Sequence, residues 1–223
     1  AMGRADATGS SAVALGDGTR ASGNNSVASG HNAHATATNA IASGNTTRAE
    51  ADNAIAIGAT ATVNAGATNS VALGRGSSVG ATATNAVALG ANSSATRANT
   101  VSVGTATANR QIVNVGAGSQ DTDAVNVSQL KGIASAIGGG AAVGADGTIT
   151  APTFNIGGTD FDNVGEALDN IDTRTTANTG AITTINTNVT NLQGDVTNLL
   201  DGTAGLVQYD ATANTNAGGV TVA

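Results

Sequence analysis

The chain has 223 residues, a net charge of −7 and few aromatic side chains: two Phe, one Tyr and no Trp. These numbers exclude an interior built on large aromatic residues, so any core must be thin. Hydrophobic residues at 40% argue against disorder, and the absence of Cys excludes disulfide and thiolate chemistry. Only 10% of the residues are charged, with acidic groups in excess, so nucleic acid is not an expected partner. No apolar run is long enough to cross a membrane, and the sequence reads as a piece of a longer protein.

One short pattern recurs seven times in residues 11–104. Each copy ends in a glycine, at spacings of 14 to 16 residues: Gly16, Gly30, Gly44, Gly58, Gly74, Gly90 and Gly104. Three positions before each glycine stands a β-branched residue: Val13, Val27, Ile41, Ile55, Val71, Val87 and Val101. The alternation around these residues predicts a strand, and a small apolar residue five positions after the glycine predicts a second one. Each copy should therefore be one coil of a parallel solenoid, with coils about 4.8 Å apart and the seven β-branched residues as the repeat core.

The polar residues of the repeat are predicted to build its turns. Glycine at the strand end permits the positive φ of a tight corner. Asparagine stands five positions before six of the seven glycines, at Asn25, Asn39, Asn53, Asn69, Asn85 and Asn99. Such residues can bond the turn backbone and stack as a ladder along the solenoid. Because seven thin coils bury little surface, we expect several solenoids to pack together.

The units "NSVALG", "NAIAIG" and "NAVALG" closely resemble the head repeat of YadA-like trimeric autotransporter adhesins. The resemblance implies a mainly β fold, in which three left-handed parallel β-rolls form a homotrimeric head over residues 1–109. Ser29 and Ser43 depart from the family pattern, because they replace its usual apolar residue.

Residues 110–132, "RQIVNVGAGSQDTDAVNVSQLKG", resemble the neck of the same family. Their own chemistry predicts the start of a helix, with Asp121 or Asp123 as its cap and Val127 and Leu130 at helical spacing.

Residues 133–163 predict a β-hairpin or small sheet with Phe154, Ile156 and Phe161 as its core, and they resemble the GIN-type inserts of the family. The triple glycine at 138–140 predicts a hinge, because no phosphate-binding pattern surrounds it.

A heptad pattern runs through residues 164–200 and predicts a coiled coil on the order of 50 Å long. Ile182 at position a and Ile185 at position d favour three strands. Asn178 also falls at d, and the resemblance implies that three such asparagines ring an anion such as chloride. The alternative is an asparagine that only fixes the register. Residues 201–223 predict two short strands around a turn, resembling the start of a further module.

Other function classes find little support in the sequence. A period of 14 to 16 argues against hexapeptide-repeat acyltransferases, and the Thr-x-Thr pairs fall at positions that cannot align into an ice-binding rank. His31 and His34 are the only histidines, and we expect both in a solvent-facing turn and not as metal ligands. No catalytic residue, organic cofactor or metal site is predicted.

The resemblance implies a passenger fragment of a bacterial surface adhesin, located at the cell surface or outer membrane. Its partners would be two further copies of the chain and, through multivalent display, collagen or other host matrix, host cells or other bacteria. The family's C-terminal membrane anchor is not in this sequence. The alternative is a passive spacer or self-association module. The pattern identifies no receptor-contacting residue, because the faces are made of residues that the repeat itself requires.

Overall fold

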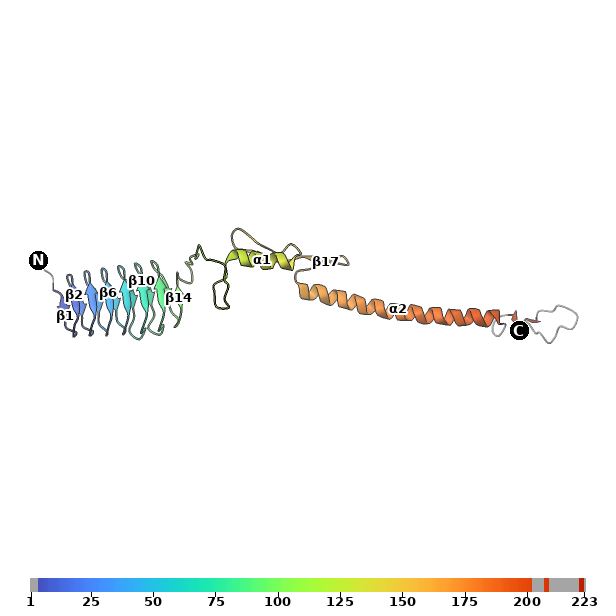
Figure 1. Ribbon diagram of the computed structural model, residues 1–223, viewed down its shortest axis with the longest axis horizontal. Helices are drawn as coiled ribbons and strands as arrows, with labels where there is room; N and C mark the ends of the chain where they lie inside the picture. Colours follow the sequence, from blue (N-terminus) through green and yellow to red (C-terminus); the bar gives the residue numbers. More distant parts are fainter. Residues whose placement is uncertain (1–3, 202–206, 209–220, 223) are drawn as a thin grey trace. The chain divides into compact units, whose positions relative to one another are not determined.

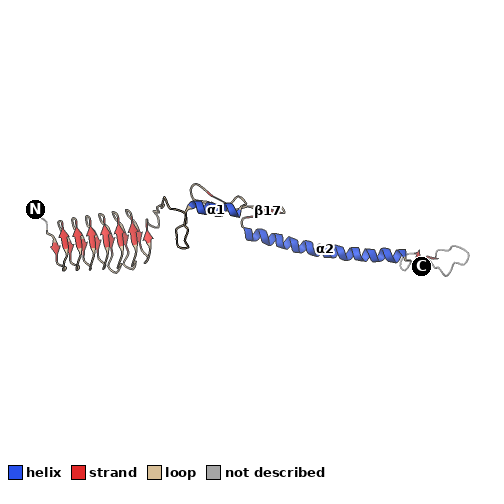
Figure 2. Ribbon diagram, viewed as in Figure 1, coloured by secondary structure: helices blue, strands red, loops and turns tan. Residues whose placement is uncertain are grey.

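The computed structural model describes residues 4–201, 207–208 and 221–222. The chain divides into two compact units, residues 1–113 and 114–223. Figure 1 colours both units along the chain, and Figure 2 shows that strands make up the first unit, whereas both described helices lie in the second.

The first unit is a parallel β-solenoid in which every coil contributes one strand to each of two seven-stranded sheets. The odd sheet consists of β1 (Asp6–Ala7), β3 (Arg20–Ala21), β5 (His34–Ala35), β7 (Arg48–Ala49), β9 (Thr62–Val63), β11 (Ser78–Val79) and β13 (Ser94–Ala95). The even sheet consists of β2 (Val13–Leu15), β4 (Val27–Ser29), β6 (Ile41–Ser43), β8 (Ile55–Ile57), β10 (Val71–Leu73), β12 (Val87–Leu89) and β14 (Val101–Ser102). Equivalent residues pair between coils, as Val71 does with Val87. The predicted two-stranded coil and parallel solenoid are confirmed.

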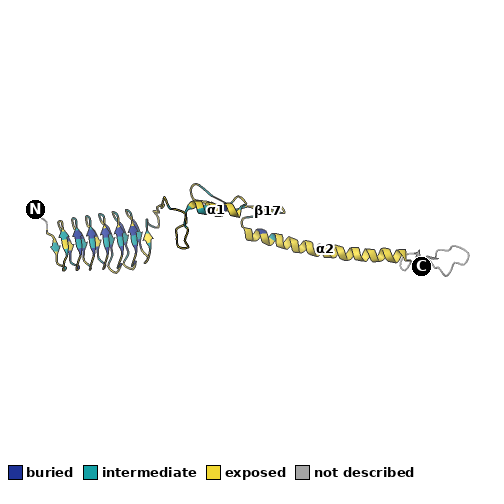
Figure 3. Cartoon of the chain, in the orientation of Figure 1, coloured by how far each residue is buried: buried dark blue, intermediate teal, exposed yellow. Residues whose placement is uncertain are grey.

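The interior of the solenoid consists mainly of alanine, together with two valines and several Ser and Thr residues, and the prediction of Val13, Val27, Ile41, Ile55, Val71, Val87 and Val101 as the repeat core is wrong for the chain. The middle residue of the even strands is fully buried at Ala28, Ala42, Ala56, Ala72 and Ala88. The seven predicted core residues lie on the opposite, outer face of these strands: Val13 and Val101 are exposed, and Val27, Ile41, Ile55, Val71 and Val87 are half-buried. The alternation of the strands was predicted correctly, but the side that faces the interior was not. A shift by one residue along a strand exchanges its inner and outer faces. Figure 3 shows the buried positions running along the coils.

Coil length sets how large an interior residue can be. The odd strands of the coils with 14-residue spacing point Ala21, Ala35 and Ala49 inward, all fully buried. The two coils with 16-residue spacing carry Val63 and Val79 at the same position, also fully buried. Two additional residues per turn therefore accompany an interior that accepts two additional methyl groups.

Asparagines hold the corners of adjacent coils together, as predicted. The six repeat asparagines have φ between 54° and 59°, and Ser11 adopts the same left-handed conformation in the first coil. Each side-chain Nδ2 donates to Oδ1 of the next asparagine, at 2.9 to 3.3 Å, from Asn25 through to Asn99. This asparagine ladder uses side-chain amides to connect turns whose strands are only two or three residues long.

Glycine is required where the coils approach most closely. Gly74 has φ of 134°, and a Cβ there would lie 2.5 Å from the carbonyl carbon of Gly90. No side chain fits this contact, so the closing glycine of the repeat is dictated by both backbone conformation and space.

The second unit begins with an irregular segment that leads into α1 (Val127–Ile137). Its N-cap is Asn126, whose side chain accepts from the backbone N–H of Gln129 in a capping box. The prediction of Asp121 or Asp123 as the cap is therefore wrong. Asp123 instead closes a turn, accepting from the N–H groups of Ser119 and Gln120 at 2.9 and 3.0 Å. These two hydrogen bonds hold the pKa of its carboxyl below the usual value.

Two antiparallel hairpins follow α1: β15 (Ala142–Val143) with β16 (Ile149–Thr150), and β17 (Phe154–Ile156) with β18 (Thr159–Phe161). The predicted hairpin is thus present, and Phe154, Ile156 and Phe161 are half-buried. The three glycines at 138–140 all have positive φ. Strand β17 contacts the first turns of the long helix, where its residues border the same pocket as Val164, Ala167 and Leu168.

The long helix α2 (Val164–Leu200) is continuous and begins at the cap Asn163. Its apolar heptad residues are exposed, among them Leu168, Ile182, Ile185 and Leu192. Strands β19 (Val207–Gln208) and β20 (Thr221–Val222) pair antiparallel, whereas the remainder of the further module predicted at 201–223 lies outside the described residues. None of the described helices combines the length and apolar character that crossing a membrane demands.

Candidate binding surfaces of the head

The outer face of the even sheet is an unpartnered apolar surface. Two ranks of side chains run along it, one at the β-branched position and one two residues later. Leu15 is 67% exposed, and Leu73 and Leu89 are 41% and 43% exposed. Ser29 and Ser43 interrupt the second rank on adjacent strands. A monomeric protein rarely leaves such a continuous apolar face in water, so this face is a candidate interaction surface.

The outer face of the odd sheet is polar. Its first rank contains, in strand order, Asp6, Arg20, His34, Arg48, Thr62, Ser78 and Ser94. Strand pairing places successive members in register, including Arg20 with His34 and His34 with Arg48. Two ion pairs lie on this side of the solenoid, Arg4 with Asp6 at 3.1 Å and Arg48 with Glu50 at 2.8 Å.

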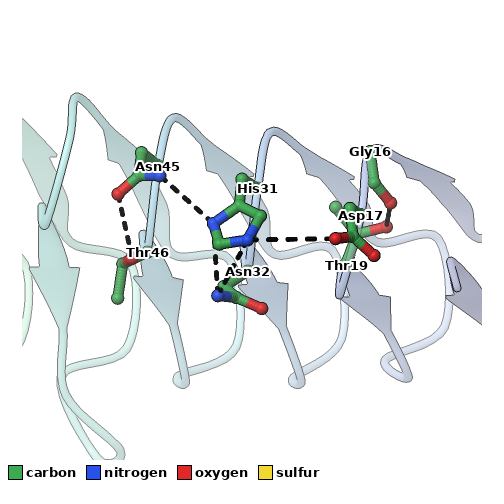
Figure 4. Close-up of polar contacts among 7 residues, drawn as sticks. All are labelled: Gly16, Asp17, Thr19, His31, Asn32, Asn45 and Thr46. Atoms are coloured by element: carbon green, nitrogen blue, oxygen red, sulfur yellow. Dashed lines mark hydrogen bonds and ion pairs between the residues drawn. The ribbon is translucent and has the colours of Figure 1, made fainter. Parts of the chain in front are cut away.

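The two histidines lie in different settings, so the prediction that both occupy a turn is wrong for His34. That residue is in β5 and half-buried on the outer face of the odd sheet. His31 is exposed in the turn after Gly30, as predicted, where its ring contacts Asn45 at 3.3 Å and lies 4.0 Å from the Asp17 carboxylate (Figure 4). Across the described residues, no three His, Cys, Asp or Glu side chains come close enough to hold a metal ion.

Arg110 closes the C-terminal end of the solenoid. Its guanidinium donates to Ser93 Oγ at 3.0 Å, to the carbonyl of Val103 at 2.5 Å and to the carbonyl of Ala91 at 2.6 Å. Sequence reasoning recognised this residue only as part of the neck pattern. Nothing local indicates its role, because its partners are 7 to 19 residues away along the chain.

Asn178 is exposed on α2, next to Thr179, whose hydroxyl donates to the carbonyl of Thr175 at 2.9 Å. Asn178 lies on the same helix as the exposed apolar heptad residues. Its predicted role as an anion ligand depends on neighbouring copies and remains a prediction.

Comparison with known proteins decides the family. The YadA head domain repeat matches residues 7–33, 35–61, 49–77 and 81–107, and the coiled stalk of trimeric autotransporter adhesin matches residues 111–153. Together these matches cover more than half of the chain. It belongs to the trimeric autotransporter adhesins. The stalk match falls on the predicted neck and part of the predicted insert, whereas α2 lies beyond it.

Two curated relatives resemble parts of this adhesin. Autotransporter adhesin EhaG of Escherichia coli O157:H7 is 62% identical over 56 residues, which are 23% of this chain and 4% of EhaG. Trimeric autotransporter adhesin AtaA of Acinetobacter sp. (strain Tol 5) is 41% identical over 107 residues, which are 42% of this chain and 3% of AtaA. The chain thus spans only a few per cent of either relative.

Among solved structures, the collagen-binding domain of the Yersinia adhesin YadA is similar at 37% identity and a TM-score of 0.47. The alignment covers 57% of this chain and 76% of that one. Adhesins of this family are non-enzymatic. Membership in a trimeric autotransporter family implies a homotrimer. The chain corresponds to part of a surface-exposed autotransporter passenger.

Proposed function

We propose that this adhesin fragment is a multivalent attachment device of a bacterial outer-membrane protein, whose targets are host matrix, host cells or other bacteria. The observation that carries the proposal is the repetitive polar face of the odd sheet, whose outer residues follow one another in register over seven coils. A periodic face can make the same weak contact several times with a clustered or fibrous target, and trimerisation multiplies it by three.

The trimer is proposed to form through the even sheet. Burial of the Val, Ile and Leu ranks between three copies would supply the hydrophobic stabilisation that an alanine interior does not. A charge at Val87 should therefore disrupt assembly, because Val87 is half-buried on this outer face and an unpaired charge is costly in an apolar interface. We expect Val87→Asp to lower the mass measured by light scattering, whereas the matched Ser78→Asp on the odd sheet should leave a trimer. Equal masses for the two variants would contradict this assignment of faces.

The helix α2 is proposed to be the three-stranded stalk, with Asn178 ringing a chloride ion at its axis. Ile182 follows Asn178 at the next heptad position and Thr175 precedes it, so three inward amides would face an apolar layer on one side and would need a polar partner. We expect Asn178→Ile to raise the helix melting temperature and abolish its dependence on halide. Thr183→Ile, outside the a and d positions, is the control. A halide response that persists in Asn178→Ile would leave only the register role.

The remaining boundaries follow from these assignments. We propose a head at 1–109, a neck at 110–132, an insert at 133–163, the stalk at 164–200 and a further module from 201. Attachment and passive spacing are distinguished by retention of the trimer on immobilised matrix proteins and on immobilised copies of itself. Retention on matrix supports adhesion, whereas self-retention alone supports the spacer or self-association alternative. A monomer near 21.2 kDa instead of three times that mass would overturn the trimeric mechanism.

A further inference from the structure

Two serines interrupt the apolar outer face of the even sheet. Ser29 and Ser43 are the last residues of β4 and β6, and they pair in register, so they lie on adjacent coils about 4.8 Å apart. The residues before them, Ala28 and Ala42, are fully buried, so both hydroxyls face outward. Other coils carry leucine or isoleucine at this position: Leu15, Ile57, Leu73 and Leu89.

The two serine hydroxyls have apolar neighbours on the same face. Strand pairing places Leu15 beside Ser29 and Ile57 beside Ser43. Val27 and Ile41, two residues earlier on the same strands, belong to the same outer face. Both serines are half-buried, and neither hydroxyl makes a hydrogen bond to any residue that the structure describes. Packing of other apolar surface onto this face would therefore bury two unpaired hydroxyls, which is unfavourable unless they find partners.

We propose that, in the trimer, Ser29 and Ser43 of the three copies line an internal cavity that holds ordered water. This inference rests on the proposed function, in which the even sheets of three copies face one another. In a threefold-symmetric assembly, equivalent residues of the copies lie at the same height along the axis, so two adjacent layers contribute six hydroxyls. Layers of Leu15 and Ile57 would close the cavity at its two ends.

Size and chemistry favour water as the ligand. A serine side chain has two heavy atoms fewer than leucine or isoleucine, so six serines leave room for a few water molecules of about 30 Å³ each. A buried water forms about two to four hydrogen bonds, which the six hydroxyls can supply. None of the seven even strands that the structure describes contains a charged residue, so an ion in this cavity would lack a counter-charge.

The test counts long-lived internal water in the trimer by magnetic relaxation dispersion of the water signal. We expect Ser29→Leu/Ser43→Leu to lose the signal that the parent gives, and its trimers to dissociate at least about tenfold more slowly, because apolar side chains fill the cavity. Ser29→Ala/Ser43→Ala removes the hydroxyls without adding bulk and should also lose the signal. The matched control is Ser78→Leu/Ser94→Leu, an in-register, half-buried pair on the outer face of the odd sheet, which should change neither quantity.

Two results would overturn the water-filled cavity and leave the trimer in place. One is a water signal that persists in Ser29→Leu/Ser43→Leu or falls equally in the control. The other is faster dissociation of Ser29→Leu/Ser43→Leu, which would show that the hydroxyls bond one another directly across the copies. A parent of monomer mass, or a Val87→Asp variant that remains trimeric, would instead remove the proposed even-sheet interface and the cavity with it.

Discussion

Removal of the Arg110 side chain should loosen the C-terminal coils of the solenoid and leave the N-terminal ones intact. The guanidinium bonds Ser93 and the carbonyls of Ala91 and Val103, which belong to the last two coils. Hydrogen bonds to charged groups contribute about 1.5–3 kcal/mol each when they are well shielded. Because Arg110 is exposed, we expect its three bonds together to contribute only about 2 kcal/mol.

The effect should be local, because each coil of a solenoid contacts only its neighbours. A loss of about 2 kcal/mol in local opening free energy corresponds to roughly 30-fold faster amide exchange. Native-state hydrogen exchange of Arg110→Ala should therefore show this acceleration at residues 91–104 and little change at residues 20–35. Arg110→Lys should fall between the two, since one ammonium cannot reproduce the fork, and Arg97→Ala is the exposed control. Uniform acceleration along the solenoid, or none near its end, would refute the reasoning.

Three further changes test the interior, the turns and the neck. Ala88→Leu should destabilise the head by about 1–3 kcal/mol in urea unfolding, because that alanine is fully buried, whereas Ala91→Leu in an exposed turn should be nearly neutral; equal effects would contradict an alanine interior. Asn69→Ala should be about 1 kcal/mol less stable than Asn69→Gly, since both break the ladder but only alanine resists a φ of 58°; the reverse order would argue against a backbone cost. The Asp123 turn should keep its hydrogen bonds above the usual Asp pKa of about 3.9 and lose them as the pH falls through the lower folded-state pKa, because protonation removes the acceptor. Amide chemical shifts of residues 119 and 120 report this transition, and a midpoint at or above 3.9 would disagree.

Much of the architecture follows from local sequence. A 14-residue period with two apolar alternations predicts two strands per coil, and a recurrent Asn and Gly predict the turns, because these residues meet conformational demands within a few positions of themselves. The heptads likewise predict α2, since helical periodicity is local. The helix cap was harder to assign: Asp121, Asp123 and Asn126 are all good N-caps, and only the capping box with Gln129 selects Asn126.

Contacts between coils had to be seen in three dimensions. Arg110 reaches back 19 residues to Ala91. Strand pairing brings Arg20 beside His34, 14 residues along the chain, and the sequence shows their equivalent positions in the repeat but not their outward direction. That direction depends on which face of each strand is inside. Alternation groups Val87 with Leu89 and sets Ala88 apart, but it does not say which group is buried. The narrow space between the two sheets decides it: a coil of 14 residues accepts alanine, one of 16 accepts Val63 or Val79, and the larger side chains of the even strands lie on the outer face.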